Sequence, residues 1–177
     1  MSAALRAAQG AIAAFAIALC ATPASAAPAV LLDQAGHAFT LQNLRGAPLV
    51  VTFVAARCTD ACPLINAQIA AATSDPRLTG VRFLTISLDP RHDTVAAMRT
   101  LSNRFGAHTP QWTFATGAVA NVQAVMRLFD VVAVANTGGI PEMHTTFVYL
   151  VNPAGHIVRA LLPSGDTSSE IAGALAR

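Results

Sequence analysis

Residues 49–63 of this chain read LVVTFVAARCTDACP. The first six of them form a continuous apolar, β-branched run, which is typical of a strand buried on both faces of a sheet. Two cysteines, Cys58 and Cys62, follow after a short interval, and Pro63 suits the first turn of a helix. The stretch therefore predicts a buried strand that leads through a cysteine-bearing loop into a helix.

Predicted strands and helices alternate over the rest of the chain. Apolar runs predict strands over residues 81–88, 112–114, 145–151 and 157–162, and a hairpin over residues 30–39. Apolar residues at helical spacing predict helices over residues 63–75, 95–105, 119–129 and 166–176. Residues 131–143, which contain two glycines and a proline, are predicted to be a long connection, and such connections are often functional.

This order of elements predicts the fold class. Strands that alternate with helices imply a sheet covered on both faces. A cysteine pair that enters the first helix after a strand is the thioredoxin-like arrangement. We therefore expect an α/β, thioredoxin-like fold, in which helices flank both faces of a central mixed β-sheet and an N-terminal β-hairpin precedes it.

The N-terminus has the plan of a secretory signal peptide. Arg6 supplies the positive charge, residues 11–19 are apolar, and residues 24–26 read Ala-Ser-Ala, an A-x-A cleavage site. The interpretation is a signal peptide over residues 1–26 and one domain over residues 27–177, exported to the periplasm. Inner-membrane anchoring by an uncleaved N-terminus is the alternative, although the apolar stretch is shorter than the roughly 20 residues that span a bilayer.

Cysteine usage favours a functional pair over a structural one. Cys20 would leave with the signal peptide, and the bulky Leu19 before it argues against lipidation. One close pair, Cys58 and Cys62, then remains, which is not the disulfide framework of small secreted domains. A disulfide across so short a loop would constrain little of the unfolded chain, so a purely structural role is unattractive.

The overall charge excludes one class of partner. The formal net charge is +2, and the basic residues are not clustered. A nucleic-acid binder would show a basic patch or stripe. No nucleic-acid partner is therefore expected, and the chain is expected to lie near a membrane without spanning it.

The two cysteines allow two kinds of chemistry. At a helix N-terminus, unpaired N–H groups and the helix dipole favour thiolate over thiol. Two thiolates can bind a soft metal such as copper, or can form a disulfide and exchange it with a partner. The three residues between Cys58 and Cys62 leave both sulfurs free to point at one external atom.

His144 is the candidate third metal ligand. It lies between the long connection and the predicted strand over residues 145–151. In a thioredoxin-like sheet that strand lies beside the one that leads to the cysteines, so the imidazole can face the two sulfurs. A metal site needs this histidine, whereas dithiol exchange does not.

Other polar residues near these motifs have simpler interpretations. Four histidines lie in or beside turns, where solvation explains them: His37, His92, His108 and His156. Turn formation or capping explains Asp89 and Asp93, with Asp93 or Thr94 able to cap the following helix, and Asp60 is expected to be solvated. Arg57 either favours the Cys58 thiolate or points into solvent.

Three motifs together resemble those of the SCO/SenC family of copper chaperones. The motifs are VTF at residues 51–53 leading into CTDACP at 58–63, then SLDPRHDT at 87–94, then HTTFVYLVNPAG at 144–155. They extend over nearly the whole predicted domain. The resemblance implies a thioredoxin-like fold and one copper ion per chain, as Cu(I) or Cu(II), held by Cys58, Cys62 and His144.

The resemblance also implies a process and a partner. It implies maturation of the binuclear copper (CuA) site of cytochrome c oxidase, by delivery of copper to the CuA-bearing subunit or by reduction of that site's cysteines. Another copper chaperone or a thiol–disulfide reductase is a further candidate partner. Two departures matter: many relatives keep an N-terminal membrane anchor, and the loop before His144 varies, so partner contacts there cannot be carried over.

The first hypothesis is therefore a copper metallochaperone rather than an enzyme. The second is a thiol–disulfide oxidoreductase in which one of Cys58 and Cys62 attacks a partner disulfide and the other resolves the mixed disulfide. A peroxidase is weaker, because nothing marks a single peroxidatic cysteine. A purely structural module leaves the two cysteines and His144 unexplained.

Overall fold

The computed structural model describes residues 28–58, 61–107, 110–135, 141–144 and 146–176. The strands are β1 (Leu31–Asp33), β2 (Ala38–Phe39), β3 (Leu49–Val54), β4 (Arg82–Ser87), β5 (Trp112–Thr116), β6 (Ala133–Ala135), β7 (Pro141–His144), β8 (Val148–Val151) and β9 (Ile157–Leu161). The helices are α1 (Ala61–Thr73), α2 (Val95–Arg104), α3 (Val119–Leu128) and α4 (Thr167–Leu175), with short 3-10 helices at Leu41–Leu44 and Pro76–Leu78.

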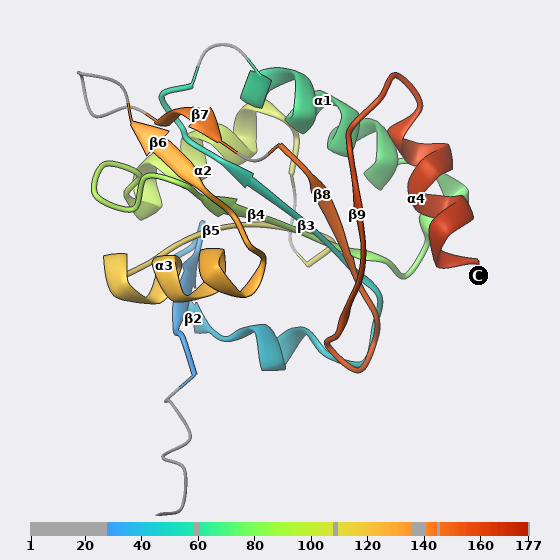
Figure 1. Cartoon of the computed structure of the whole chain (residues 1–177), viewed down its shortest axis with the longest axis horizontal. Coiled ribbons are helices and arrows are strands. Elements are labelled where there is room, and N and C mark those ends of the chain that lie inside the picture. The colour runs from blue at the N-terminus through green and yellow to red at the C-terminus, as the bar shows by residue number, and fades with distance from the viewer. Residues whose placement is uncertain (1–27, 59–60, 108–109, 136–140, 145, 177) are drawn as a thin grey trace, which may run out of the picture.

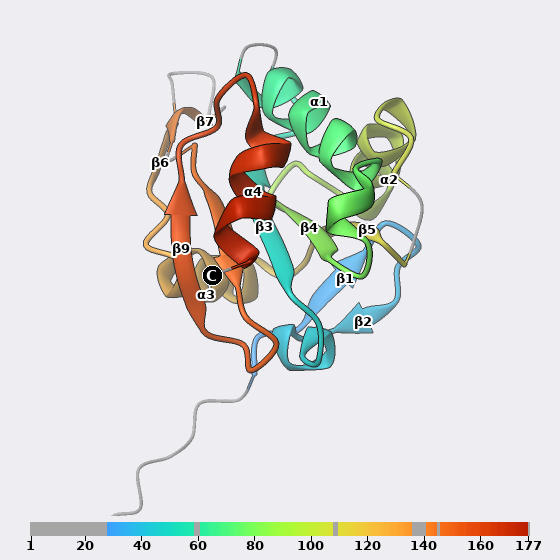
Figure 2. The ribbon, with the colours of Figure 1, turned by 90° about the vertical axis from the view of Figure 1, so that its right-hand side faces the viewer.

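Seven of the strands form one mixed sheet in the order β2-β1-β5-β4-β3-β8-β9. The central strands β3, β4 and β5 are parallel, and the outer pairs are antiparallel. Helices α1, α2 and α4 cover one face and α3 covers the other (Figures 1 and 2). The predicted mixed sheet flanked by helices on both faces is confirmed.

The continuous apolar run of β3 is explained by burial on both sides. Val50 and Val54 belong to the hydrophobic cluster under α1, α2 and α4, whereas Val51 and Phe53 belong to the cluster under α3. Because successive side chains of a strand point to opposite faces, every position of such a central strand must be apolar or hydrogen-bonded. The polar member, Thr52, shares a hydrogen bond of 3.0 Å between its hydroxyl and that of Thr85.

Strand pairing fixes which chain segments meet at one edge of the sheet. β3 and β4 run parallel, so they end side by side at Val54 and Ser87. β8 runs antiparallel to β3, with Val51 opposite Tyr149, so β8 begins at the edge where β3 ends. The cysteine loop after β3, the turn after β4 and the segment before β8 therefore share this edge, as expected for a cysteine loop and a histidine on neighbouring strands.

The structure corrects two predicted boundaries. The segment 131–143, predicted as a connection, contains the short hairpin of β6 and β7, with Ala133 opposite His144. The strand that follows begins at Val148 rather than at Thr145. Strands of three or four residues are too short to show a reliable alternation in sequence, so the glycines and the proline dominated the prediction.

Candidate metal centre

The structure brings the two cysteines together. Cys58 lies in the turn after β3, where its N–H donates to the Ala55 carbonyl oxygen at 3.0 Å. Cys62 lies in the first turn of α1 and is only 2% exposed, whereas Cys58 is half-buried. The two cysteines are not joined in a disulfide, and the Cys62 thiol hydrogen-bonds with Cys58. Cys58 is thus the more accessible of the two thiols at this edge of the sheet.

Burial reverses the expected thiolate character of Cys62. Removal from water, the largest cause, and the hydrogen bond with Cys58 together raise the pKa of the Cys62 thiol to about 12, although a backbone hydrogen bond with Ala55 acts to lower it. The helix N-terminus was expected to favour the thiolate, but desolvation outweighs it here. A metal ion that binds both sulfurs must therefore displace a proton from Cys62.

The backbone of His144 lies at the same edge of the sheet. β7 ends at His144, opposite Ala133 of β6, and β8 begins at Val148. Ala133 packs against the same hydrophobic cluster as Cys58. The imidazole itself lies outside the part of the structure that is described, so His144 as a ligand stays a prediction.

A buried carboxylate ties the cysteine loop to the end of β4. Asp93, only 1% exposed, accepts a 2.7 Å hydrogen bond from the Ser87 hydroxyl. Both of its carboxylate oxygens lie 3.2 Å from the Ala56 nitrogen, two residues before Cys58. Burial raises the pKa of Asp93, and the bonds from Ser87 and Ala56 offset this only in part. Asp93 therefore supports the loop.

The cap of α2 is a different residue. The Thr94 hydroxyl oxygen accepts the Ala97 N–H at 3.2 Å and caps α2. Of the two predicted caps, Asp93 and Thr94, the structure selects Thr94. Asp93 instead accepts hydrogen bonds from Ser87 and Ala56. Its position in the sequence, just before a helix, did not predict these contacts.

A second carboxylate organises the outer side of the loop. The Arg57 guanidinium donates to Asp89 at 2.8 Å, and the His92 Nδ1 lies 2.8 Å from the other Asp89 oxygen. Burial alone would raise the pKa of Asp89, but the hydrogen bonds from Arg57 and His92 hold it below its usual value. Arg57 thus pairs with Asp89 rather than with Cys58, and His92 is a partner of Asp89.

Two of the remaining candidates from the sequence, His37 and His156, are described by the structure. His37 pairs with Asp33, with 3.2 Å between the ring nitrogen and the carboxylate oxygen, and His156 is exposed after a tight turn. Asp60 and His108 lie outside the described residues. Neither His37 nor His156 forms a metal-binding group with the cysteine pair among the described residues.

We predict that the role of Asp93 can be separated from its charge. Asp93→Ala should lower the free energy of unfolding by about 1–3 kcal/mol, because the Ala56 N–H and the Ser87 hydroxyl lose a buried acceptor. Asp93→Asn keeps the shape and an acceptor oxygen, so it should cost less. Chemical denaturation at neutral pH measures both. Equal losses for the two variants would contradict the hydrogen-bonding role.

The contribution of Asp93 to the free energy of unfolding should change with pH in a definite direction. Because the folded-state pKa of Asp93 is raised, its contribution to stability is present in acid and is lost as pH rises through that pKa. The stability of Asp93→Asn relative to the unchanged chain should therefore improve between about pH 4 and pH 7. The same denaturation series at the two pH values tests this, and a relative decline would show that Asp93 is stabilised as the anion.

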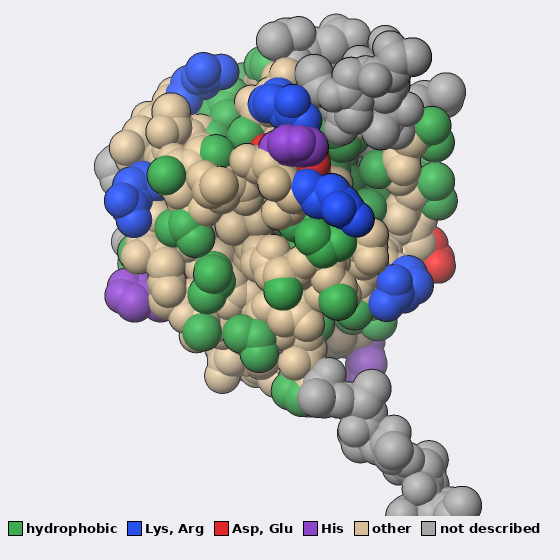
Figure 3. Space-filling view, turned by 90° about the vertical axis from the view of Figure 1, so that its left-hand side faces the viewer, with side chains coloured by type: hydrophobic (Ala, Val, Ile, Leu, Met, Phe, Trp, Pro, Cys, Tyr) green, Lys and Arg blue, Asp and Glu red, His purple; other side chains and the backbone are tan. Residues whose placement is uncertain are grey.

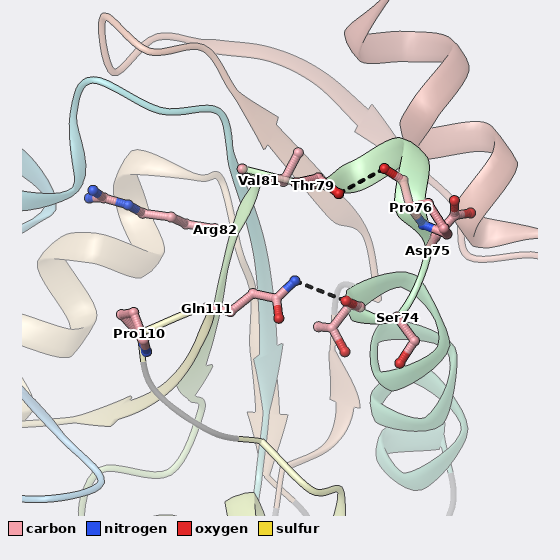
Figure 4. A pocket seen from close by; sticks show the side chains of 10 residues that line it. Ser74, Asp75, Pro76, Thr79, Val81, Arg82, Pro110 and Gln111 are labelled. Carbon is pink, nitrogen blue, oxygen red and sulfur yellow. Dashed lines mark hydrogen bonds between the residues drawn. The ribbon is translucent and has the colours of Figure 1, made fainter.

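A cavity lies away from the cysteine pair. Its volume is about 500 Å³, and its lining includes Asp75, Arg82 and Gln111 (Figure 4). The Gln111 side-chain amide donates to the Thr73 carbonyl oxygen at 2.9 Å. Arg82 begins β4, whereas the cysteine loop adjoins the end of β4, so this cavity and the cysteines lie at opposite edges of the sheet.

The donor chemistry fits a soft metal ion. Two adjoining sulfurs favour Cu(I) over hard cations such as Mg²⁺ or Ca²⁺. Among the described side chains, no group of three histidine, cysteine or acidic residues is placed to hold a metal. A third donor to Cys58 and Cys62 would have to come from a side chain outside that set, as His144 would. Within the same residues, no helix combines the length and apolar character that crossing a bilayer requires.

Comparison with known proteins identifies relatives of this chain. A family model described as SCO1/SenC matches residues 21–177. The mitochondrial SCO2 homolog of Danio rerio is 30% identical over 133 residues, which cover 71% of this chain and 47% of that protein. The chain thus spans about half the length of that relative.

Solved structures show the same fold. The structure of Bradyrhizobium japonicum ScoI with copper bound matches with a TM-score of 0.69 at 27% identity, over 85% of this chain and 97% of that chain. Arabidopsis thaliana ScoI with copper bound matches with a TM-score of 0.74 at 23% identity, with the same coverage. The thioredoxin-like architecture is therefore shared with copper-bound proteins.

Proposed function

This chain belongs to the SCO1/SenC family, and from that premise we propose that it is an exported copper-binding metallochaperone. In this proposal Cys58, Cys62 and His144 hold one copper ion, as Cu(I) or Cu(II). The observation that carries the proposal is the pair of adjoining, reduced thiols at the edge of the sheet. The copper-bound relatives and the backbone position of His144 beside the same edge support it.

The proposed partner is the CuA-bearing subunit of cytochrome c oxidase. The chain would deliver copper to that site or prepare its cysteines, and another copper chaperone or a thiol–disulfide reductase would load or reduce the chain. Residues 1–26 would direct export to the periplasm and residues 27–177 would form the one working domain, with an uncleaved anchor as the alternative. A half-buried Cys58 beside a buried Cys62 suits handover, since one ligand is accessible to an incoming thiol.

Copper titration tests the three-ligand site. A competitive Cu(I) and Cu(II) titration of the reduced chain should show one tightly bound ion. His144→Ala should weaken copper affinity by at least about tenfold, because changing a residue that only supports a metal ligand already costs about tenfold to a hundredfold. His156→Ala is the matched control, because His156 is an exposed histidine that follows a tight turn. Binding that is weak, or indifferent to His144, would contradict the site.

The unequal exposure of the two thiols favours a second candidate function, dithiol exchange. The Cys58 thiolate would attack a partner disulfide and release one partner thiolate. Cys62 would then give up its proton and attack the Cys58 sulfur, which releases the second partner thiolate. The partner is reduced by two electrons and the Cys58–Cys62 pair is oxidised to a disulfide.

A trapping experiment tests this alternative. Cys62→Ser removes the resolving thiol, so it should accumulate a mixed disulfide with a CuA domain whose cysteines are oxidised. Cys58→Ser should accumulate far less, because Cys62 is buried and its pKa is raised. Non-reducing electrophoresis and intact mass spectrometry read the result. Equal trapping by both variants would contradict the assignment of Cys58 as the attacking thiol.

A further inference from the structure

A small cleft opens beside the cysteine loop, on the side of α2. Its volume is about 260 Å³. Two arginines of its lining, Arg57 and Arg104, come from the cysteine loop and from the last turn of α2. Ala97 and Thr100 give it a wall of small side chains, and the buried Asp93 lies at its base. Because Arg57 directly precedes Cys58 in the sequence, the cleft lies next to the cysteine loop.

The exposed charged side chains that line this cleft are basic. Asp89 is 6% exposed and pairs with Arg57 and His92, while Asp93 is fully enclosed. Arg57 keeps 40% of its side chain exposed in spite of its ion pair. On the face drawn in Figure 3, basic and histidine side chains lie side by side around a small acidic area. The described carboxylates here are therefore turned inward, and the cations face outward.

The guanidinium of Arg104 has hydrogen-bond donors that no other described residue of the chain accepts. Its side chain is exposed and makes no hydrogen bond or ion pair with any residue in the described part of the chain. A guanidinium presents a planar fork of donors that matches a carboxylate. The volume of the cleft is that of one or two side chains, too small for a large organic ligand, which needs roughly 300–1,000 Å³.

We propose that this cleft docks a carboxylate side chain of the protein that receives copper, between Arg57 and Arg104. The proposal rests on the proposed function, because it assumes an acceptor protein. The occupant is a protein side chain rather than a free anion, since the cleft adjoins the sulfur that the acceptor must reach. Docking there would hold the acceptor with its own thiols close to Cys58.

Charge reversal of Arg104 tests the docking cleft. The dissociation constant of the copper-loaded chain for the CuA domain of the oxidase subunit is measured at low ionic strength by calorimetry. Arg104→Glu should raise it by at least about tenfold, and Arg104→Lys should raise it less, because it keeps the charge but loses the fork. Arg127→Glu is the matched control: Arg127 is also an exposed arginine in the last turn of a helix, on the opposite face of the sheet.

A second variant removes the space instead of the charge. Ala97→Leu fills the cleft from α2 and should also weaken binding, with the copper stoichiometry unchanged. Binding by Arg104→Glu and Ala97→Leu that equals that of the unchanged chain would overturn the docking cleft and leave the proposed function intact. Absence of any complex between the unchanged, copper-loaded chain and the CuA domain would overturn both. An equal loss in Arg127→Glu would show a non-specific charge effect and would also overturn the cleft.

Discussion

Cys62→Ser is expected to weaken Cu(I) binding by more than about a hundredfold, because changes to the outer shell of a metal site already cost tenfold to a hundredfold. A serine hydroxyl is a hard, neutral donor, whereas Cu(I) prefers thiolate sulfur. Cys58→Ser should have a comparable effect, since the two sulfurs adjoin. A competition titration with a Cu(I) chelator measures both variants.

The two serine variants differ usefully in their structural cost. Cys62 is buried in the cluster under α1, whereas Cys58 is half-buried at the surface. Circular dichroism therefore separates loss of a ligand from loss of fold, since Cys58→Ser should melt close to the unchanged chain. If either variant bound Cu(I) as tightly as the unchanged chain, that cysteine would not be a ligand and the metal site would have to be redrawn.

Phe53→Ala is expected to lower the free energy of unfolding by about 3–5 kcal/mol. Phe53 is 2% exposed in the cluster under α3, and its ring meets Phe129 and Tyr149 edge-on, with centroid distances of 5.5 and 6.0 Å. Truncation removes these contacts and leaves a cavity between the sheet and α3. Because small domains are stable by about 5–15 kcal/mol, the loss would be a large fraction of the total. Chemical denaturation followed by circular dichroism measures it.

Phe147→Ala is the matched control for this core variant. Phe147 is 40% exposed, and its ring contact with Tyr149 is at 6.2 Å. Its truncation should cost at most about 1.5 kcal/mol, the value of one exposed aromatic pair. A loss equal to that of Phe53→Ala would mean that the cluster under α3 does not dominate stability.

The sequence predicted best where one local pattern was enough. The apolar run at 49–54 became β3 with the same bounds, because both faces of the central strand are buried. The helix predicted over residues 95–105 is likewise present, as α2 (Val95–Arg104). The adjacency of Cys58 and Cys62 followed from their spacing at a strand-to-helix junction.

Prediction was weakest where distant contacts decide the outcome. Asp93 was interpreted as a turn or cap residue, yet its partner Ala56 lies 37 positions away and is brought near only by the parallel pairing of β3 and β4. The pKa of Cys62 depends on how deeply α1 packs, which spacing does not show. His144 as a ligand, export and the bounds of the domain remain predictions, since they depend on a side chain and a terminus outside the described residues.

The antiparallel pairing of β3 with β8 has a consequence for the thermodynamics of metal uptake. In a flexible chain, joining the proposed ligands Cys58 and His144, which are distant in sequence, would carry a loop-closure entropy of about 4 kcal/mol. Here the hydrogen bonds between β3 and β8 bring the two segments together during folding, before any ion binds. The apo chain should therefore fold cooperatively by itself, unlike a zinc finger. Copper should raise its melting temperature only as mass action with a bound ligand requires.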